Sequence, residues 1–396
     1  MRSSHPVSLN AMYLDANATS PLAEEVWEAM MPWWRAGFHN PSSSHRGGKK
    51  ARAAIELARA QVAELIGAQD DEIVFTSGGT ESINALLRSW DGVGGSGHFL
   101  TTAVEHSAVL RAGAALTRTM LTCGVNEAGA LDLSVWQQDL MGAAFAAGMA
   151  ANNETGVIMD WQKASQLAHE HGVPFFCDAV QAVGKIPLAV TDVAVDALAL
   201  SAHKFHGPKG VGALYLRRGT KFSPLLYGGG QERGMRSGTE AVPLIVGMGV
   251  AAELAKKRLT AGSEARMAEM RDAFEQAVLA GVSGVSVNGD PASRLPNTSH
   301  LSFDGCEAAG LLILLDEKGV ACSAGSACMS GKQQPSHVQK AMGFSDARAK
   351  SSLRFSFSVE NTIEEALKAA SHVSAAVSKL RSVQSSGVGP VVIYTP

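Results

Sequence analysis

The chain has 396 residues, of which 46% are hydrophobic and 18% are charged, and its formal net charge at pH 7 is −3. This composition indicates a soluble globular protein with room for one large domain and a smaller one, and it argues against a dedicated nucleic-acid-binding protein. No stretch reaches the roughly 18 apolar residues of a membrane span, and residues 1–9 lack the apolar core of a secretory signal, so we expect a cytoplasmic protein without membrane contact.

The N-terminal part predicts two helices. Ser20 and Pro21 are suited to the N-cap and the first position of a helix that runs to about Arg35. Gly67 predicts the end of a longer helix over 45–66.

A glycine turn at Gly78 and Gly79 then joins an apolar strand to the start of a helix, within residues 72–84. Free backbone N–H groups and the helix dipole make such a junction a phosphate site, to which Thr80 could add its hydroxyl. It is not a Walker motif, because no Gly-Lys-Ser/Thr follows. A tight turn without a ligand is equally compatible with this stretch.

Further apolar segments, at 98–104, 143–151, 174–177 and 195–200, also end in polar residues. The alternation of strand, polar tip and helix predicts an α/β fold with a mostly parallel sheet and helices on both faces. Because ligands bind at the carboxyl ends of such strands, we expect the polar tips to converge at one edge. Their residues are His106, Asn153, Asp178, Gln181, Ser201, His203 and Lys204.

Lys204 is the most informative of these tips. A lysine at the end of a buried strand is costly unless it is paired, deprotonated or used covalently. A free amine is what a carbonyl cofactor such as pyridoxal phosphate requires. The alternative is a lysine that simply reaches water. If Lys204 holds the cofactor, Asp178 is the candidate partner of its pyridine nitrogen, and Thr80 and Ser201 could hold its phosphate.

The part of the chain from about residue 260 predicts a smaller α+β domain. Short strands are expected at 298–303 and 319–322, with a helix at 307–315 between them. An alternating strand at 351–357 carries Arg354, which either binds an amino-acid carboxylate as a bidentate pair or is a surface arginine. Beyond Leu380 the Ser/Gly-rich tail predicts disorder.

The five cysteines are an odd number without a Cys-x-x-Cys pair, which favours reduced thiols over a disulfide framework or a zinc site. Cys123 and Cys177 have apolar neighbours and are expected in the core. Cys328 lies in a loop of small residues at 323–332, where packing does not explain an exposed thiol.

A set of specific motifs extends from Tyr13 to about Ser358. They are Tyr-Leu-Asp-x-Asn-Ala-Thr at 13–19, Thr-Ser-Gly-Gly-Thr-Glu at 76–81, Glu-His-Ser-Ala-Val at 105–109, Asn-Asn-Glu-Thr-Gly at 152–156, Asp-Ala-Val-Gln-Ala-Val-Gly-Lys at 178–185, His-Lys-Phe-His-Gly-Pro-Lys-Gly at 203–210, Arg-Ser-Gly-Thr-Glu at 236–240 and Ala-Gly-Ser-Ala-Cys-Met-Ser-Gly at 324–331. Through them the chain resembles cysteine desulfurases of the class V aminotransferase family, in the branch that serves nitrogen fixation and iron–sulfur cluster assembly. It departs from the family pattern at Ala16 and Met329.

The resemblance implies a fold-type I pyridoxal-phosphate enzyme with a mostly parallel seven-stranded sheet. The large cofactor-binding domain would span 13–259, and a small C-terminal domain at 260–383 would carry the cysteine loop. Residues 1–12 would pack on the small domain, and 384–396 would form a tail.

The resemblance also implies a role for each site residue. Lys204 would bind the cofactor and move a proton at the substrate α-carbon, and His106 would stack on the ring. Cys328 would take the substrate sulfur as a persulfide, with release of alanine, and Arg354 with Asn17 would bind the carboxylate of L-cysteine. The cofactor-binding set would be Gly79, Thr80, His106, Asn153, Asp178, Gln181, Ser201, His203, Lys204 and, from the second subunit of a homodimer, Thr239.

Partners and alternatives follow from the same resemblance. The sulfur would pass to an iron–sulfur scaffold or another acceptor protein, and no metal is intrinsic, although Cys328 could serve as a transient iron–sulfur ligand. A selenocysteine lyase, or another class V aminotransferase-like enzyme, is the first alternative. A paralogue that acts only as a scaffold is the second, and a colourless purified protein would favour it.

Overall fold

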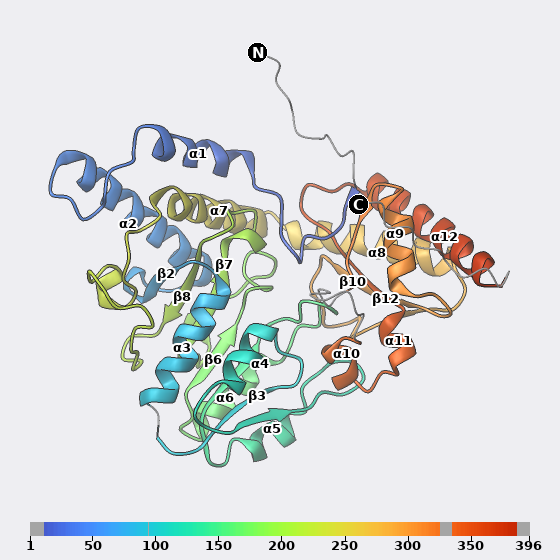
Figure 1. Cartoon of the computed structure of the whole chain (residues 1–396), viewed down its shortest axis with the longest axis horizontal. Helices are drawn as coiled ribbons and strands as arrows, with labels where there is room; N and C mark the ends of the chain where they lie inside the picture. The colour runs from blue at the N-terminus through green and yellow to red at the C-terminus, as the bar shows by residue number, and fades with distance from the viewer. Residues whose placement is uncertain (1–11, 94, 325–334, 386–396) are drawn as a thin grey trace, which may run out of the picture.

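The computed structural model describes residues 12–93, 95–324 and 335–385. Cys328 lies outside these ranges, as do residues 386–396. In Figure 1 the described chain forms a large body around a wide sheet and a smaller body at the right, built from the C-terminal elements. The site predicted above is assembled where the strands of the large body end.

Seven strands form the central sheet in the order β2-β8-β7-β6-β5-β3-β4. Only β8 runs antiparallel to its neighbours, and the remaining pairs are parallel. The predicted mostly parallel seven-stranded sheet is therefore confirmed. The strands are Ile73–Thr76 (β2), His98–Thr102 (β3), Met120–Cys123 (β4), Ala143–Met149 (β5), Phe175–Asp178 (β6), Ala197–Ser201 (β7) and Gly212–Leu216 (β8).

Helices cover both faces of this sheet because successive residues of a strand point to opposite sides. Val74 and Phe99 join one buried cluster, which includes apolar residues of α3 (Gly79–Val93) and α4 (Ser107–Ala114). Their chain neighbours Phe75 and Leu100 join the cluster on the other side. The helices of that second cluster are α1 (Glu24–Arg35), α2 (Arg46–Ile66), α5 (Leu133–Asp139), α6 (Trp161–Glu170) and α7 (Val242–Thr260).

The helix ends test two of the sequence predictions. Gly67 adopts a left-handed φ of 66° after α2, as a helix-ending glycine should. Ser20, in contrast, does not cap α1, which begins at Glu24 after Ala23. The Ser20 hydroxyl instead donates to the carbonyl of His203 and accepts from the N–H of His206, at 3.0 and 2.7 Å. The expected cap is wrong because these long-range bonds tie the segment to the turn that carries Lys204.

The smaller body has its own buried core and a three-stranded antiparallel sheet, in the order β12-β10-β9. A two-stranded parallel sheet, β1 with β11, attaches the N-terminal residues to the same core. All residues of β12 are buried, so the alternation expected for that strand does not separate a wet face from a dry one. These strands are Met12–Tyr13 (β1), Val285–Val287 (β9), Thr298–Phe303 (β10), Val320–Ala321 (β11) and Ser352–Ser356 (β12).

Helices complete the smaller body, and the last of them continues past Leu380, where we expected the chain to lose order. They are α8 (Ser263–Gly281), α9 (Ala308–Asp316), α10 (His337–Ala341), α11 (Asp346–Lys350) and α12 (Ile363–Ser385). None of the helices in the described ranges is long and apolar enough to cross a membrane.

Candidate active site

The predicted tip residues lie at the carboxyl ends of neighbouring strands, as expected. Asp178 is the last residue of β6 and Ser201 the last of β7, and Lys204 ends the short 3-10 turn that follows. His106 is the N-cap of α4, where its Nδ1 accepts from the N–H of Ala108 at 3.1 Å. That bond places the ring proton on Nε2 and leaves the imidazole side chain exposed at the same edge.

Lys204 is held rather than free. Its Nζ donates to the backbone carbonyls of Asn17 and Ala18 at 2.5 and 2.8 Å. Burial, aided by the positive charge of Arg354, lowers the pKa of Lys204 to about 8, although Asp178 and Asp15 oppose the shift. At pH 7 about a tenth of this lysine is therefore the free amine that attack on a carbonyl requires.

Two buried carboxyl groups lie near each other at this edge. Asp178 accepts from the N–H of Val180 at 3.0 Å, and its burial raises its pKa, with His106 and Lys204 acting against the shift. Glu105 is fully buried, and burial followed by the charge of Asp178 raises its pKa to about 8. Glu105 is thus neutral at pH 7, and Asp178 is the carboxyl group that a cationic ring nitrogen would meet.

Glu105 was not among the predicted site residues. Its Oε1 accepts from the Thr102 hydroxyl and the Met149 N–H, both at 2.8 Å, whereas its Oε2 is buried without a partner. The available signal was a glutamate directly after an apolar strand, a position where a solvated carboxylate is unexpected.

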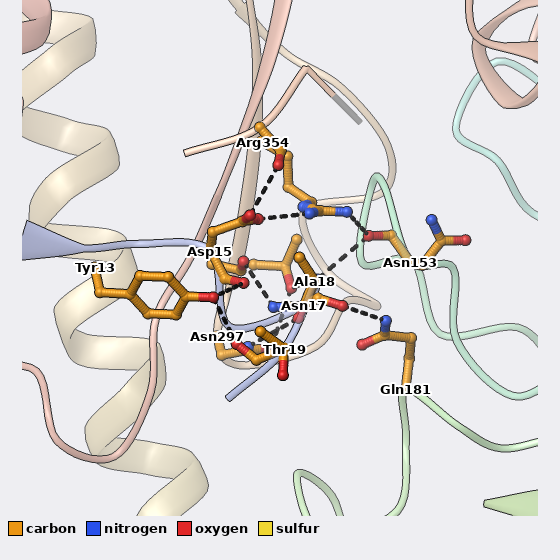
Figure 2. A network of polar contacts seen from close by, with 12 residues as sticks. Tyr13, Asp15, Asn17, Ala18, Thr19, Asn153, Gln181, Asn297 and Arg354 are labelled. Carbon is orange, nitrogen blue, oxygen red and sulfur yellow. Dashed lines mark hydrogen bonds and ion pairs between the residues drawn. The ribbon is translucent and has the colours of Figure 1, made fainter. Parts of the chain in front are cut away.

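Asn17 lies at the centre of the polar network in Figure 2. Its backbone carbonyl accepts from Gln181 Nε2 at 2.9 Å, as well as from Lys204. Its side chain is 1% exposed and donates to the Thr298 hydroxyl at 2.9 Å. The side-chain oxygen accepts from Lys185 and Asn297 at 2.8 and 3.1 Å. Asn17 therefore connects the N-terminal segment, the lysine turn and the smaller body.

Arg354 is buried in β12, so the surface-arginine alternative is wrong. Its Nη2 donates to Asp15 Oδ1 at 2.6 Å, and its Nη1 donates to the carbonyl of Asn153 at 2.9 Å, as Figure 2 shows. Its Nε is buried without a partner. The guanidinium thus lies next to Lys204 with donor capacity left, in surroundings where a small carboxylate could be bound.

The remaining predicted residues lie in different surroundings. His203 Nδ1 lies 3.1 Å from the Thr19 hydroxyl, and burial lowers its pKa to about 4, so this ring is neutral at pH 7. Gly79 leaves no room for a side chain, since a Cβ there would lie 2.7 Å from Val180 Cγ2. Thr80, one residue on, is exposed at the start of α3, and Thr239 is exposed in the loop before α7.

These residues fit pyridoxal phosphate. The start of α3 offers N–H groups and the Thr80 hydroxyl to a phosphate. Asp178, buried at the end of β6, suits a protonated ring nitrogen, and Lys204 supplies the amine. In contrast, no group of three or more His, Cys, Asp or Glu residues within the described ranges could hold a metal ion.

Comparisons with known proteins agree with this geometry. The sequence model of the family Aminotransferase class-V matches residues 12–368, and the chain belongs to this family, whose members use pyridoxal phosphate. The chain is 44% identical to a cysteine desulfurase of Gluconacetobacter diazotrophicus over 382 residues, which cover 95% of each protein. It is 45% identical to a cysteine desulfurase of Sinorhizobium fredii, over 94% of this chain and 98% of the relative.

A solved structure of a NifS-like protein superposes with a TM-score of 0.88 at 33% identity, over 93% of this chain and 100% of that one. The likeness therefore extends over both bodies of the fold, and it confirms the predicted fold class.

Proposed function

We propose that this protein is a pyridoxal-phosphate-dependent cysteine desulfurase, which converts L-cysteine into L-alanine and an enzyme-bound persulfide. The observation that carries the proposal is Lys204, a half-buried amine with a pKa of about 8 that the charges of both Asp178 and Arg354 reach. The relatives named above, which match almost the whole chain, support the same activity.

In this reaction Arg354, Asp178 and Lys204 each have a definite task. Arg354 binds the substrate carboxylate through its free N–H and through the donors it shares with Asp15 and Asn153. Asp178 keeps the ring nitrogen of the cofactor protonated. When bound, the cofactor supplies an electron sink for the bond to the substrate α-hydrogen. Lys204, as the free amine, takes that α-proton.

In the step that transfers sulfur, Cys328 is the nucleophile. Its thiolate attacks the substrate sulfur, so that a sulfur–sulfur bond forms while the carbon–sulfur bond breaks. The electron pair of the broken bond stays with the carbon fragment, which gains protons and leaves as alanine. No external oxidant is needed, because the sulfur leaves cysteine at the oxidation level of the persulfide.

We further propose a cytoplasmic homodimer in which Thr239 of each subunit completes the phosphate site of the other. The exposure of Thr239 and the polar loop that carries it are compatible with this arrangement. The persulfide would then be passed to an iron–sulfur scaffold or another sulfur acceptor. We propose that the large domain spans 13–259 and the small domain 260–383.

The activity is tested by incubating the purified yellow protein with L-cysteine, with L-selenocysteine and with an amino-acid/keto-acid pair, while alanine and released sulfur or selenium are measured. We expect alanine from L-cysteine, and none from a Lys204→Ala variant. Faster turnover of L-selenocysteine than of L-cysteine would favour the lyase instead, and transfer of an amino group to the keto acid would favour an aminotransferase. A colourless protein without any of these activities would favour the scaffold alternative.

A further inference from the structure

We propose that Lys185 is a positioning residue of the active site, which fixes the amide of Gln181 with its Nε2 available to the cofactor and holds Asn17 in contact with Lys204. This inference rests on the proposed cofactor-binding roles of Gln181 and Lys204. Lys185 ends the motif at 178–185, but no role has been given to it so far.

The surroundings of Lys185 are unusual for a lysine. Its side chain is 5% exposed, and its Nζ donates to Gln181 Oε1 at 2.6 Å and to Asn17 Oδ1 at 2.8 Å. Both acceptors are neutral amides, and no ion pair to Lys185 occurs within the described ranges. Burial, with the nearby charges of Lys204 and Arg354, lowers the pKa of Lys185 well below its ordinary value. The amine is therefore held in place by two hydrogen bonds that it donates to neutral amides.

The bond to Gln181 decides which end of that amide faces the site. An amide has one acceptor end and one donor end, and the amine of Lys185 occupies the acceptor end. The donor end, Nε2, consequently points to the carbonyl of Asn17, 2.9 Å away, where Lys204 also donates. Without Lys185 the amide could turn by 180° and present its oxygen to the site.

The bond to Asn17 has a second effect on the same site. Asn17 Oδ1 accepts from both Lys185 and Asn297, and Nδ2 donates to Thr298, so the side chain is fixed at both ends. The carbonyl of this residue is an acceptor for Lys204. Lys185 thus acts on Gln181 by direct contact and on Lys204 through Asn17.

Packing alone does not account for a lysine here. A methionine would fill a similar volume without desolvating an amine, and replacing buried polar groups by apolar side chains of like volume is often neutral or stabilising. Lys185 also lines a cavity with Lys204, His206 and Arg258, and its amine is close enough to Lys204 to feel the charge of that lysine.

The cofactor itself can report the orientation of Gln181. If Nε2 donates to the phenolic oxygen of bound pyridoxal phosphate, it favours the deprotonated form of that oxygen, and losing the donor raises the pKa of the cofactor chromophore. The charged or titratable groups that face Lys204 and contribute to this titration are Asp15, His106, Asp178, Lys185, His203 and Arg354.

The experiment is a pH titration of the visible absorbance of the holoenzyme. We expect Lys185→Met to raise the midpoint by about one pH unit, the size of one lost hydrogen bond, without lowering the unfolding temperature. Lys49→Met, which removes an exposed lysine of α2, should leave the midpoint unchanged. Lys185→Gln, which keeps an N–H donor, should stay near the wild-type midpoint. In a Gln181→Ala background, Lys185→Met should cause no further shift.

An unchanged midpoint in Lys185→Met would overturn the proposal, and so would equal shifts in the Met and Gln variants or a full shift in the Gln181→Ala background. Failure of both Lys185 variants to fold would assign the residue to the fold and would also overturn it. The readout needs no substrate, so it stands even if cysteine is not the substrate. A colourless wild-type protein would instead refute the proposed function.

Discussion

Replacing Glu105 with Gln should remove a pH-dependent weakness from the fold. Glu105 is fully buried three residues after the end of β3, and its pKa is raised from 4.5 to about 8 by burial and by the charge of Asp178. Its Oε2 has no partner, so a glutamine NH₂ group at that position loses no hydrogen bond. The variant is close in shape to the protonated carboxyl group that the native state prefers.

The size of the effect follows from proton linkage. Between pH 4.5 and about 8 the native state keeps a proton on Glu105 that the unfolded chain has released, so stability falls as pH rises through this window. From pH 5.5 to 7.5 the loss amounts to about 2.5 kcal/mol, because stability falls by about 1.4 kcal/mol for each pH unit between the two pKa values and by slightly less near pH 8. Glu105→Gln should lack this loss.

The assay is urea unfolding of the cofactor-free protein at pH 5.5, 6.5 and 7.5. The free energy of unfolding of Glu105→Gln, relative to wild type, should increase by about 2.5 kcal/mol across this range. Glu127→Gln, at an exposed glutamate, serves as the matched control and should show no such trend. A difference between Glu105→Gln and wild type that does not change with pH would refute the raised pKa and the neutral state inferred from it.

Substitutions at two buried arginines provide further tests. Arg354→Lys keeps the charge but loses the planar pair of donors, so we expect the KM for L-cysteine to rise about 30-fold with a smaller change in kcat; steady-state kinetics would show an unchanged KM if Arg354 does not bind substrate. Arg59 and Glu232 form a buried pair at 2.7 and 2.8 Å. Arg59→Met alone should cost about 3 kcal/mol in urea unfolding, and adding Glu232→Met should recover a good part of it; additive losses would contradict the coupling.

Much of the sheet could be predicted from the sequence because its central strands are apolar runs that end in polar tips. β6 and β7, for example, are buried on both faces, so each is a continuous apolar run whose end is marked by the first polar residues. β4 was missed because it is an edge strand with exposed residues, such as Leu121, and has no continuous apolar run. The strand order has no local signal, since it depends on which faces of distant segments pack together.

In the site, too, residues with a local signal could be predicted, and contacts between distant segments could not. Lys204, Asp178 and His106 could be predicted because each follows its own strand. Asp15, the partner of Arg354, could not be predicted as such, since the two residues are 339 positions apart and meet only when β12 folds beside the N-terminal segment. Ser20 shows the opposite error, in which a good local capping signal was overridden by bonds to the lysine turn.

The most direct test of the account is the fate of the sulfur in wild type and in Cys328→Ala. With L-cysteine and a thiol acceptor, wild type should release alanine and sulfur in equal amounts. The variant should keep the yellow cofactor, because Lys204 and its partners are intact, but it should release no sulfur. Sulfur release by Cys328→Ala at the wild-type rate would contradict the assignment of the nucleophile and, with it, the division of labour between the lysine that prepares the substrate and the cysteine that takes its sulfur.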